Sequence, residues 1–274
     1  MSRGVAKVAI NIINVLTLPF TSRQKKRIVA RTIAELEKGS LRSVSTNNGE
    51  LKFLALKSAF VASAVERFHI DEPETLEWID GFNKGETFWD VGANIGLYSL
   101  YAGLTQKVVV YAFEPSGINY GLLVEHIKIN KMGDKVKPFC IALSDHISIE
   151  DLYMSYSEVG HSSNSLGVAR NQVQDYTPKF IQSTPAFSID GFIKLFDLTP
   201  PDHLKIDVDG IEPLILSGAK DTLSRVKDVL VEVEGSNLEH VEEQIEKPLI
   251  QSGMREQKHY REKGSKRNRL YSRM

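Results

Sequence analysis

The loop between Asp90 and Gly96 is the feature that most constrains how this chain can fold. It reads Asp90-Val91-Gly92-Ala93-Asn94-Ile95-Gly96 and joins a β-rich run at 87–91 to a helical pattern at 95–104. Glycines at such a junction let the backbone turn sharply and let a ligand approach it closely. The free N–H groups at the start of the following helix can bind that ligand. We therefore predict a strand–loop–helix unit that holds a cofactor.

The segments after this loop alternate between apolar runs of strand length and helical patterns. Strands are predicted at 108–113, 136–143, 204–208 and 229–234, and helices at 118–130, 188–196, 212–223 and 241–252. This alternation is typical of βαβ units and indicates an α/β protein with a mainly parallel, Rossmann-like sheet. At the C-terminus, 255–260 and 269–273 flank a basic loop and are predicted to pair as an antiparallel hairpin.

The N-terminal part of the chain has a different pattern. Residues 1–40 are predicted to be helical, and Asn47-Asn48-Gly49 indicates a β-hairpin between 41–46 and 51–56. A helix is predicted at 59–68. A short helix at 75–82 follows and leads into the first strand of the alternating region.

Two domains follow from this organisation. We expect residues 1–70 to form an N-terminal helical and hairpin extension, and residues 71–274 to form the cofactor-binding domain. Residues 146–187 are rich in Ser, Asn, Tyr and Gly and interrupt the alternation. We predict that they form an insertion on the substrate side, over the edge of the sheet.

Composition excludes several classes of protein. The 34 basic and 35 acidic residues give a formal net charge of -1, which provides no overall attraction to nucleic acid or to an anionic membrane. The single cysteine, Cys140, cannot form an intrachain disulfide, so a cytoplasmic location is expected. No apolar run reaches the roughly 18 residues that a membrane span needs.

Apolar residues near the N-terminus recur at helical spacing and predict an amphipathic helix. They are Val5, Val8, Ala9, Ile12, Ile13 and Leu16. The favoured interpretation is that this helix packs on the body of the protein. The alternative places residues 1–31 on a membrane surface, beside the basic run at 23–27, but the polar face before residue 23 is not basic. A signal peptide is disfavoured because Asn11 and Asn14 interrupt the apolar run and basic residues follow it.

An acidic residue at the end of the next strand helps to identify the cofactor. Glu114 lies 18 residues after Gly96, where a carboxylate can accept hydrogen bonds from both ribose hydroxyls of an adenosine cofactor. The loop lacks the middle glycine of the usual G-x-G-x-x-G pattern, and Asp90 would be an unfavourable neighbour for a pyrophosphate. S-adenosylmethionine carries an ammonium and a sulfonium instead, and both suit an acidic loop.

Four motifs together resemble the FkbM family of methyltransferases. They are FWDVGANIGLYSL at 88–100, YAFEP at 111–115, ALSD at 142–145 and LKIDVDGIE at 204–212. The resemblance covers roughly residues 70–235. It implies a Rossmann-like class I methyltransferase sheet, S-adenosylmethionine as the cofactor, and methylation of a hydroxyl group on a sugar, glycan or natural product.

The resemblance also assigns the residues that would bind the cofactor. It implies that the methionine part lies against Asp90, Gly92, Asn94 and Gly96, and that Glu114 holds the ribose. It further implies that the adenine amine faces Asp145, with Ala142 and Leu143 near the ring. The chain departs from the family motif at Asp209, where the family often has Glu. The negative charge is kept, but the side chain is shorter.

Methylation of an alcohol needs a base, because a neutral hydroxyl is a poor nucleophile. Asp207, Asp209 and Glu212 follow the fourth strand, and Glu232 and Glu234 end the fifth. Crowded carboxylates raise one another's pKa, which suits a general base. We therefore take Asp207 and Asp209 as candidate catalytic residues. Two alternatives are a Mg²⁺ or Ca²⁺ site and a purely structural role, in which Asp207 caps a helix or orders the cofactor pocket; no metal site is predicted.

His161, in the polar insertion, is a further candidate base. An exposed loop histidine without a role is the alternative. Lys205 lies within a strand and is expected to pair with an acid. A basic C-terminal run is interpreted as a solvated loop, with contact to phosphate or an acidic glycan as the alternative; it comprises Arg261, Lys263, Lys266, Arg267 and Arg269.

The sequence therefore predicts an S-adenosylmethionine-dependent O-methyltransferase with a small-molecule or glycan hydroxyl acceptor. Three alternatives remain. A nucleic-acid base methyltransferase is disfavoured, because Asp207-Val208-Asp209-Gly210 replaces the Asn/Asp-Pro-Pro-aromatic motif of such enzymes and the net charge is near zero. A nicotinamide-dependent oxidoreductase is disfavoured by the loop pattern. A non-catalytic cofactor-binding or scaffold protein of a biosynthetic pathway is the alternative of another class.

Overall fold

A seven-stranded sheet lies at the centre of the computed structural model, which describes residues 2–156, 158–162, 164–169, 176–233 and 241–273. The strands lie side by side in the order β12-β13-β11-β10-β3-β4-β5. Their bounds are β3 (Thr87–Val91), β4 (Val109–Phe113), β5 (Val136–Phe139), β10 (His203–Ile206), β11 (Asp228–Glu232), β12 (Met254–Glu256) and β13 (Asn268–Arg273).

The sheet is parallel except at its C-terminal hairpin. β3 pairs parallel with β4 and with β10, and in that register Asp90 lies opposite Lys205. β13 runs antiparallel to both β11 and β12. The Rossmann-like fold and the terminal hairpin are therefore confirmed. Glu234 lies outside the described residues.

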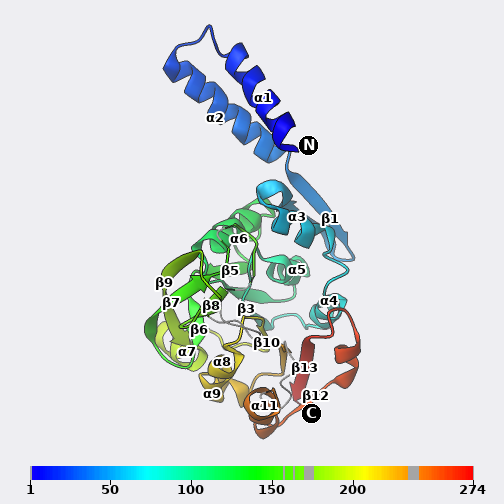
Figure 1. Ribbon diagram of the computed structural model, residues 1–274. Coiled ribbons are helices and arrows are strands. Elements are labelled where there is room, and N and C mark those ends of the chain that lie inside the picture. Colours follow the sequence, from blue (N-terminus) through cyan, green and yellow to red (C-terminus); the bar gives the residue numbers. More distant parts are fainter. Residues whose placement is uncertain (1, 157, 163, 170–175, 234–240, 274) are drawn as a thin grey trace.

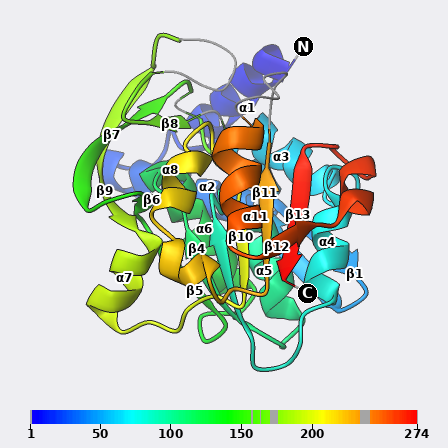
Figure 2. The ribbon, with the colours of Figure 1, turned by 90° about the horizontal axis from the view of Figure 1, so that it is seen from below.

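Alternate side chains of the strands enter two separate cores. Phe88 and Val110 enter the core on one face of the sheet, and Trp89 and Tyr111 enter the core on the other. This is the period-two pattern of a strand that is buried on both sides. Helices cover both faces (Figures 1 and 2). The first core packs against α4 (Pro73–Asp80), α5 (Leu97–Leu104) and α6 (Gly117–Ile129), and the second against α7 (Ile189–Phe196), α8 (Glu212–Ser217), α9 (Lys220–Leu223) and α11 (Lys247–Gln251).

A second, four-stranded sheet corresponds to the interrupted region of the sequence. Its order is β6-β9-β7-β8. The strand predicted at 136–143 is therefore wrong as a single element, because β5 ends at Phe139 and β6 begins at Ala142 in the other sheet. The sequence analysis also missed the long strand β9. The bounds are β6 (Ala142–Ser144), β7 (Ser148–Met154), β8 (Asn164–Leu166) and β9 (Phe180–Ser188).

Two predicted helices are divided in the structure. The helix expected at 212–223 is interrupted at Gly218, where a Cβ would lie 2.3 Å from the carbonyl oxygen of Ser144. The helix expected at 241–252 begins with a wider turn at Glu242–Glu246 before α11. In the part of the chain that the structure describes, no helix is long and apolar enough to cross a membrane.

The predicted β-hairpin and the helix after it are confirmed. β1 (Leu41–Thr46) and β2 (Gly49–Leu54) are antiparallel, and α3 (Ala59–Glu66) follows. Leu51 and Phe53 of β2 are fully buried and belong to the same core as α5 and α6. This part of the N-terminal extension therefore completes one face of the central domain.

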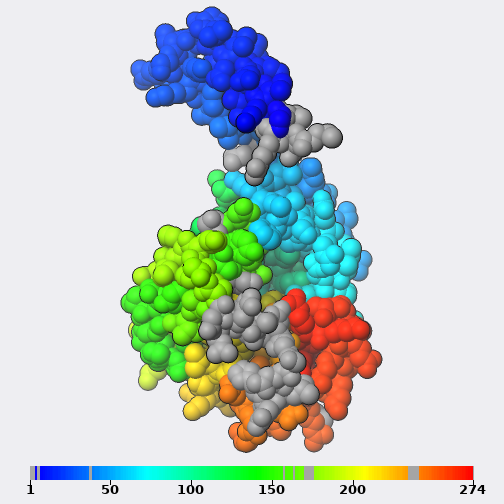
Figure 3. All heavy atoms as spheres, viewed as in Figure 1, coloured from blue at the N-terminus to red at the C-terminus, as the bar shows by residue number. Residues whose placement is uncertain are grey.

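The first two helices stand away from the body, so the favoured prediction for them is wrong. α1 (Ser2–Leu16) and α2 (Ser22–Lys38) form a hairpin that projects beyond β1 and α3 (Figures 1 and 3). The apolar side chains of α1 do not face the body: Val15 is 64% exposed and Leu16 is 67% exposed. Among the side chains of this hairpin that the structure describes, Thr17 alone is buried.

A buried polar network lies at the end of the sheet where β10 begins. Nδ1 of His203 lies 2.8 Å from Oδ1 of Asp228, and its Nε2 lies 2.8 Å from Oε2 of Glu86. The indole N–H of Trp78 donates to Asp228, and the ring of Phe82 stacks on the imidazole at 3.7 Å. Both nitrogens of His203 therefore face carboxylates, which favours the charged imidazolium.

Candidate active site

The loop that follows β3 is held by contacts within the protein. Gly92 has φ +87°, and a Cβ at this position would lie 1.8 Å from the carbonyl oxygen of Asp207. Gly96 has φ +89°, and its Cβ would lie 2.4 Å from the side chain of Leu123. The N–H groups of Gly92 and Ala93 both donate to the carbonyl of Phe113 at 3.0 Å. The two glycines are thus required by the neighbouring strand and helix as well as by any ligand.

Asp90 lies beneath this loop and is 1% exposed. One carboxylate oxygen accepts the hydroxyl of Ser99, whereas Oδ1 has no hydrogen-bond partner among the described residues. Burial raises the pKa of Asp90, and the charge of Lys205 opposes that shift. Asp90 does not itself line the cavity described below, so its predicted contact with the methionine part of the cofactor stays a prediction.

Glu114 is fixed at the end of β4 by backbone groups. It accepts the N–H of Asn94 at 2.9 Å and the N–H of Ser116 at 2.8 Å. Burial raises the pKa of Glu114 to about 7, although these hydrogen bonds lower it. The carboxylate keeps further lone pairs, because each ionised carboxylate has about four acceptor sites. It is placed to accept hydroxyl groups, as the sequence predicts for a ribose.

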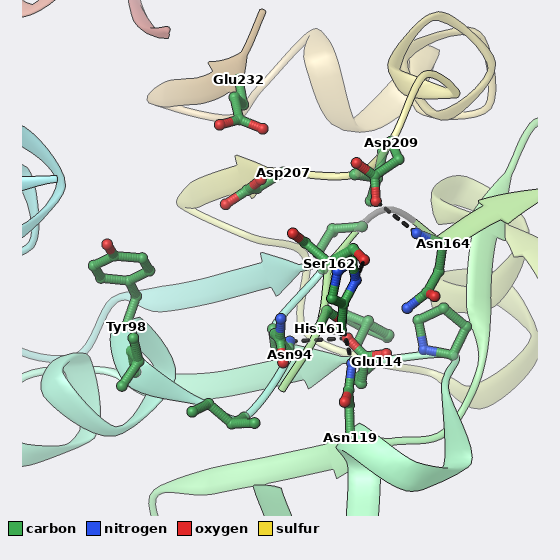
Figure 4. Close-up of a pocket in the computed structure, with 18 of the residues that line it drawn as sticks. Asn94, Tyr98, Glu114, Asn119, His161, Ser162, Asn164, Asp207, Asp209 and Glu232 are labelled. Carbon is green, nitrogen blue, oxygen red and sulfur yellow. Dashed lines mark hydrogen bonds between the residues drawn. The ribbon is translucent and has the colours of Figure 1, made fainter. Parts of the chain in front are cut away.

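A cavity of about 710 Å³ connects this loop with the ends of β10 and β11. That volume suits a cofactor or other small-molecule ligand. Glu114 and Asn94 line it together with Asp207, Asp209 and Glu232 (Figure 4). The structure therefore brings together most of the residues that the sequence assigned to cofactor binding and to catalysis.

The predicted adenine contacts are only partly brought to the cavity. Ala142 and Leu143 line it. Asp145 does not, and its carboxylate lies 2.6 Å from Nδ1 of His146 instead. The hydrogen bond from His146 lowers the pKa of Asp145. The role of Asp145 toward the adenine amine stays a prediction.

Opposite charges alternate at the ends of β10 and β11. Lys205 is buried and donates to Asp207, as the sequence analysis expected for a lysine within a strand. Its Nζ also lies 4.9 Å from the centre of the Tyr98 ring. Burial lowers the pKa of Lys205, but Asp207, Glu72 and other carboxylates outweigh it and raise that pKa above its usual value. Lys205 is therefore a permanent cation in this site.

The pKa values of Asp207 and Glu232 are shifted in opposite directions. Burial alone would raise the pKa of Asp207, but Lys205 and a hydrogen bond from Glu232 lower it. Burial and the charge of Asp207 raise the pKa of Glu232 to about 10. A guanidinium nitrogen of Arg267 lies 3.1 Å from Oε1 of Glu232. The crowding expected from the sequence is therefore real, but it protonates Glu232 and leaves Asp207 ionised.

Asp209 lies in the same cavity but makes a different contact. Its Oδ2 accepts the backbone N–H of Asn164 at 2.9 Å. β10 ends at Ile206, so the two aspartates are not related by the alternation of a continuing strand. Asp209 thus connects the end of β10 to the second sheet, and a catalytic role for it stays a prediction.

His161 lies over the cavity on a loop that two helices hold in place. The side chain of Asn119 on α6 accepts the N–H of Gly160 and donates to the carbonyl of His161 at 3.2 Å. Ser58, the N-cap of α3, donates to the carbonyl of Val159. The imidazole stacks on Tyr156 at 3.8 Å, and its pKa is lowered by burial, so the ring is neutral. It is therefore competent as a base.

Several lining residues were missed by the sequence analysis. Asn119 lies within a helical pattern that looks like ordinary packing, and Glu72 lies before α4, outside the alternating region. Only the fold brings them to the cavity, so no local signal identifies them. Glu72 is buried, and burial raises its pKa.

Most of the basic C-terminal run is paired with acids. Arg261 and Arg269 contact Glu246 at 3.0 and 2.7 Å, and Lys263 pairs with Glu77. Arg267 lines the cavity. This run is thus a set of ion pairs around one edge of the site. Among the described residues, no group of three His, Cys, Asp or Glu side chains is arranged to hold a metal ion.

The sequence profile of the FkbM methyltransferase domain matches residues 90–257. The chain belongs to this family. The match begins at Asp90 and includes the loop, Glu114, the second sheet and both acidic strand ends. The cofactor of the family is S-adenosylmethionine, as the loop and Glu114 predict.

Three known proteins that are similar to the chain are named as methyltransferases. A hexuronic acid methyltransferase, AglP, of Haloferax volcanii is 26% identical over 150 residues, which are 55% of this chain and 56% of that protein. The chain thus spans about half the length of this curated relative. Two solved structures are similar. The precorrin-6y C5,15-methyltransferase of Geobacter metallireducens has TM-score 0.40 and 14% identity over 68% of this chain and 72% of that one. An S-adenosylmethionine-dependent methyltransferase of Aquifex aeolicus has TM-score 0.38 and 15% identity, over 76% and 92% respectively.

Proposed function

We propose that the protein transfers the methyl group of S-adenosylmethionine to a hydroxyl group of a sugar or glycan. The observation that carries this proposal is a single cavity that contains both Glu114, after the glycine loop, and the ionised Asp207 beside Glu232. A hydroxyl acceptor needs a group that takes its proton next to the methyl donor. The candidate proton acceptor, Asp207, and the candidate cofactor residue, Glu114, both line this cavity.

The residues around the loop fit the cofactor. Glu114 is held by backbone N–H groups and keeps lone pairs for the ribose hydroxyls. Oδ1 of Asn94 is buried without a hydrogen-bond partner among the described residues, so it is available to a ligand donor. Asp90 lies buried below the loop, where burial raises its pKa and the charge of Lys205 opposes that shift. When bound, S-adenosylmethionine supplies a methyl group on a positively charged sulfur, which these acidic groups favour.

Asp207 is the proposed proton acceptor. It is ionised, it lines the cavity, and Lys205 and Glu232 hold it by hydrogen bonds. In the proposed transfer the oxygen–carbon bond would form as the carbon–sulfur bond breaks, S-adenosylhomocysteine would leave, and the hydroxyl proton would pass to Asp207. Glu232 is protonated and cannot accept that proton, but its hydrogen bond stabilises the carboxylate. His161, neutral and on the cavity wall, is the second candidate for this role.

An acidic sugar is the acceptor class that we favour. Arg67 and Arg267 line the cavity, and guanidinium groups bind carboxylates well. The relative from Haloferax volcanii is named for a hexuronic acid, which is a sugar with a carboxylate. Arg67 already pairs with Asp71, and Arg267 with Glu232, so an incoming carboxylate would compete with these side chains.

The proposal is tested by incubating the protein with S-adenosylmethionine and a panel of uronic acids, matched neutral sugars and NAD⁺. Release of S-adenosylhomocysteine, with a product heavier by one methylene, is the expected result. Glu114→Ala is expected to abolish cofactor binding by calorimetry. Tight cofactor binding without turnover of any hydroxyl acceptor would instead support a non-catalytic cofactor-binding protein. Binding of NAD⁺ in place of S-adenosylmethionine would overturn the proposal.

A further inference from the structure

The turn between α1 and α2 exposes large apolar side chains at the far end of the projecting hairpin (Figure 1). Leu18 is 75% exposed, and Phe20 is 45% exposed. Val15 and Leu16, at the end of α1, continue the same surface. Large apolar side chains that are exposed together at the end of a projecting hairpin indicate an interaction surface.

Basic residues follow directly on this apolar tip. The first half of α2 contains Arg23, Lys25, Lys26 and Arg27, and all four lie within two turns of its start. Residues 1–34 hold seven Lys or Arg and no Asp or Glu. Since the whole chain has a net charge of -1, residues 35–274 carry -8. The hairpin is therefore a basic pole on an acidic protein.

We propose that this hairpin docks the protein on an anionic lipid bilayer, with Leu18 and Phe20 in the interface and the lysines and arginines of α2 at the headgroups. Apolar residues next to a basic cluster are the combination that binds such surfaces. The acidic body is repelled by the same surface, so the hairpin points toward the bilayer and the body away from it.

Two other occupants fit less well. A second copy of the hairpin, whose residues 2–38 hold eight Lys or Arg and two Glu, would bring a net charge of +6 against another +6. A nucleic acid would match the charge but would leave Leu18 and Phe20 without an apolar environment. A bilayer with anionic headgroups satisfies both features.

Flotation of the full chain with vesicles tests the proposal. We expect binding to vesicles of equal parts phosphatidylglycerol and phosphatidylcholine, and at least about ten-fold weaker binding to phosphatidylcholine alone. Leu18→Ser with Phe20→Ser, and separately Lys25→Glu with Lys26→Glu, should each lower the partition coefficient at least about ten-fold. High salt should weaken the binding of the wild-type chain.

Matched variants on the body show whether vesicle binding depends on the hairpin surface or on any exposed apolar or basic residues. Leu195→Ser with Phe196→Ser changes exposed apolar residues of α7, and Lys84→Glu with Lys128→Glu changes exposed lysines. Both should leave vesicle binding unchanged. Unaltered binding in the hairpin variants, or equal binding to both kinds of vesicle, would overturn the proposal. A sedimentation shift from dimer to monomer in the Leu18 and Phe20 variant, without vesicle binding by the wild type, would assign the surface to a second copy.

This experiment does not depend on the proposed function. Vesicle binding is measured without substrate, and S-adenosylmethionine binding of each variant by calorimetry shows that the body remains folded. A failed methyltransferase assay and a failed flotation experiment therefore have separate meanings.

Discussion

Asp207 and Glu232 lie at the ends of the neighbouring strands β10 and β11, and the pKa values of their carboxyl groups are shifted in opposite directions. Burial and the charge of Asp207 raise the pKa of Glu232 to about 10, which favours its protonated form. Lys205 keeps Asp207 ionised. Two adjacent acids of the same chemistry are thus given different roles, which can be separated by amide substitutions.

Asp207→Asn removes the anion, whereas Glu232→Gln replaces a protonated acid by a neutral donor of similar shape. We expect Asp207→Asn to lower kcat by about 10²- to 10⁴-fold, the usual contribution of a general base. Glu232→Gln should lower it less than about ten-fold, because the amide still donates to Asp207. Steady-state kinetics with calorimetric cofactor affinity check both. Comparable losses in the two variants would contradict the assignment of the proton, and a large loss in His161→Ala alone would move the base to His161.

Glu114 should make cofactor affinity depend on pH near neutrality. Its pKa of about 7 in the free protein reflects burial, and accepting ribose hydroxyls favours the ionised form. Binding therefore releases protons at neutral pH, and affinity falls as the pH drops below about 7. Calorimetry in buffers of different ionisation enthalpy measures this release. Glu114→Gln should bind weakly and without the pH dependence; an unchanged pH profile in that variant would assign the titration to another group.

Gly92→Ala should destabilise the protein and weaken cofactor binding. The new Cβ would lie 1.8 Å from the carbonyl oxygen of Asp207, at a backbone φ of +87°. Replacements at such a position cost more than about 1 kcal/mol. Urea denaturation gives the stability. Gly121→Ala in α6 is the matched control, because a Cβ there has open space and gains helix propensity. Equal stability of the two variants would show that the Gly92 loop can relax.

The network around His203 predicts how stability changes with pH. Burial lowers the pKa of His203, but Asp228 and Glu86 outweigh it and raise that pKa above its usual value. A raised pKa stabilises the folded state below the unfolded pKa, and this contribution is lost as the pH rises through the folded pKa. Thermal melts between about pH 6 and about pH 9 should show this loss in the wild type and a smaller change in His203→Gln.

Glu86 shows the opposite dependence within the same network. Although burial opposes it, hydrogen bonds from Lys227 and His203 lower its pKa to about 2. Its contribution is therefore present above the unfolded pKa and is lost as the pH falls toward about 2. Glu86→Gln should flatten the acidic limb of the melting curve and leave cofactor binding intact. An acidic limb unchanged in Glu86→Gln would mean that other carboxylates determine it.

The central sheet was predictable because its signals are local. The strand at 87–91 is a run of five residues that is followed directly by a glycine-bearing loop, and this local order predicts a strand–loop–helix unit. The second sheet was not predictable in this way. β9 alternates weakly, and its partner β6 is separated from β5 by only two residues, so the change of sheet leaves no mark in the pattern.

The candidate site shows the same division. Glu114 and Asp207 follow strand ends, so topology alone places them in the crevice. Charge states depend on neighbours that are distant in sequence, such as Glu232 and Arg267 around Asp207. The prediction that the N-terminal helix packs on the body of the protein was wrong. An amphipathic pattern shows that a helix has an apolar face, but it does not show what covers that face.

The close approach of Gly92 to the carbonyl of Asp207 places the cofactor loop directly against the residue proposed as the proton acceptor. If either the Gly92 loop or the Asp207 segment moved, the other would have to move as well. A substitution in either segment would therefore disturb both the cofactor position and the chemistry. Divergence toward new acceptors is then confined to segments that reach the cavity without touching that contact. The loop carrying His161 and the C-terminal segment around Arg267 are among such segments, and variation between relatives should concentrate there.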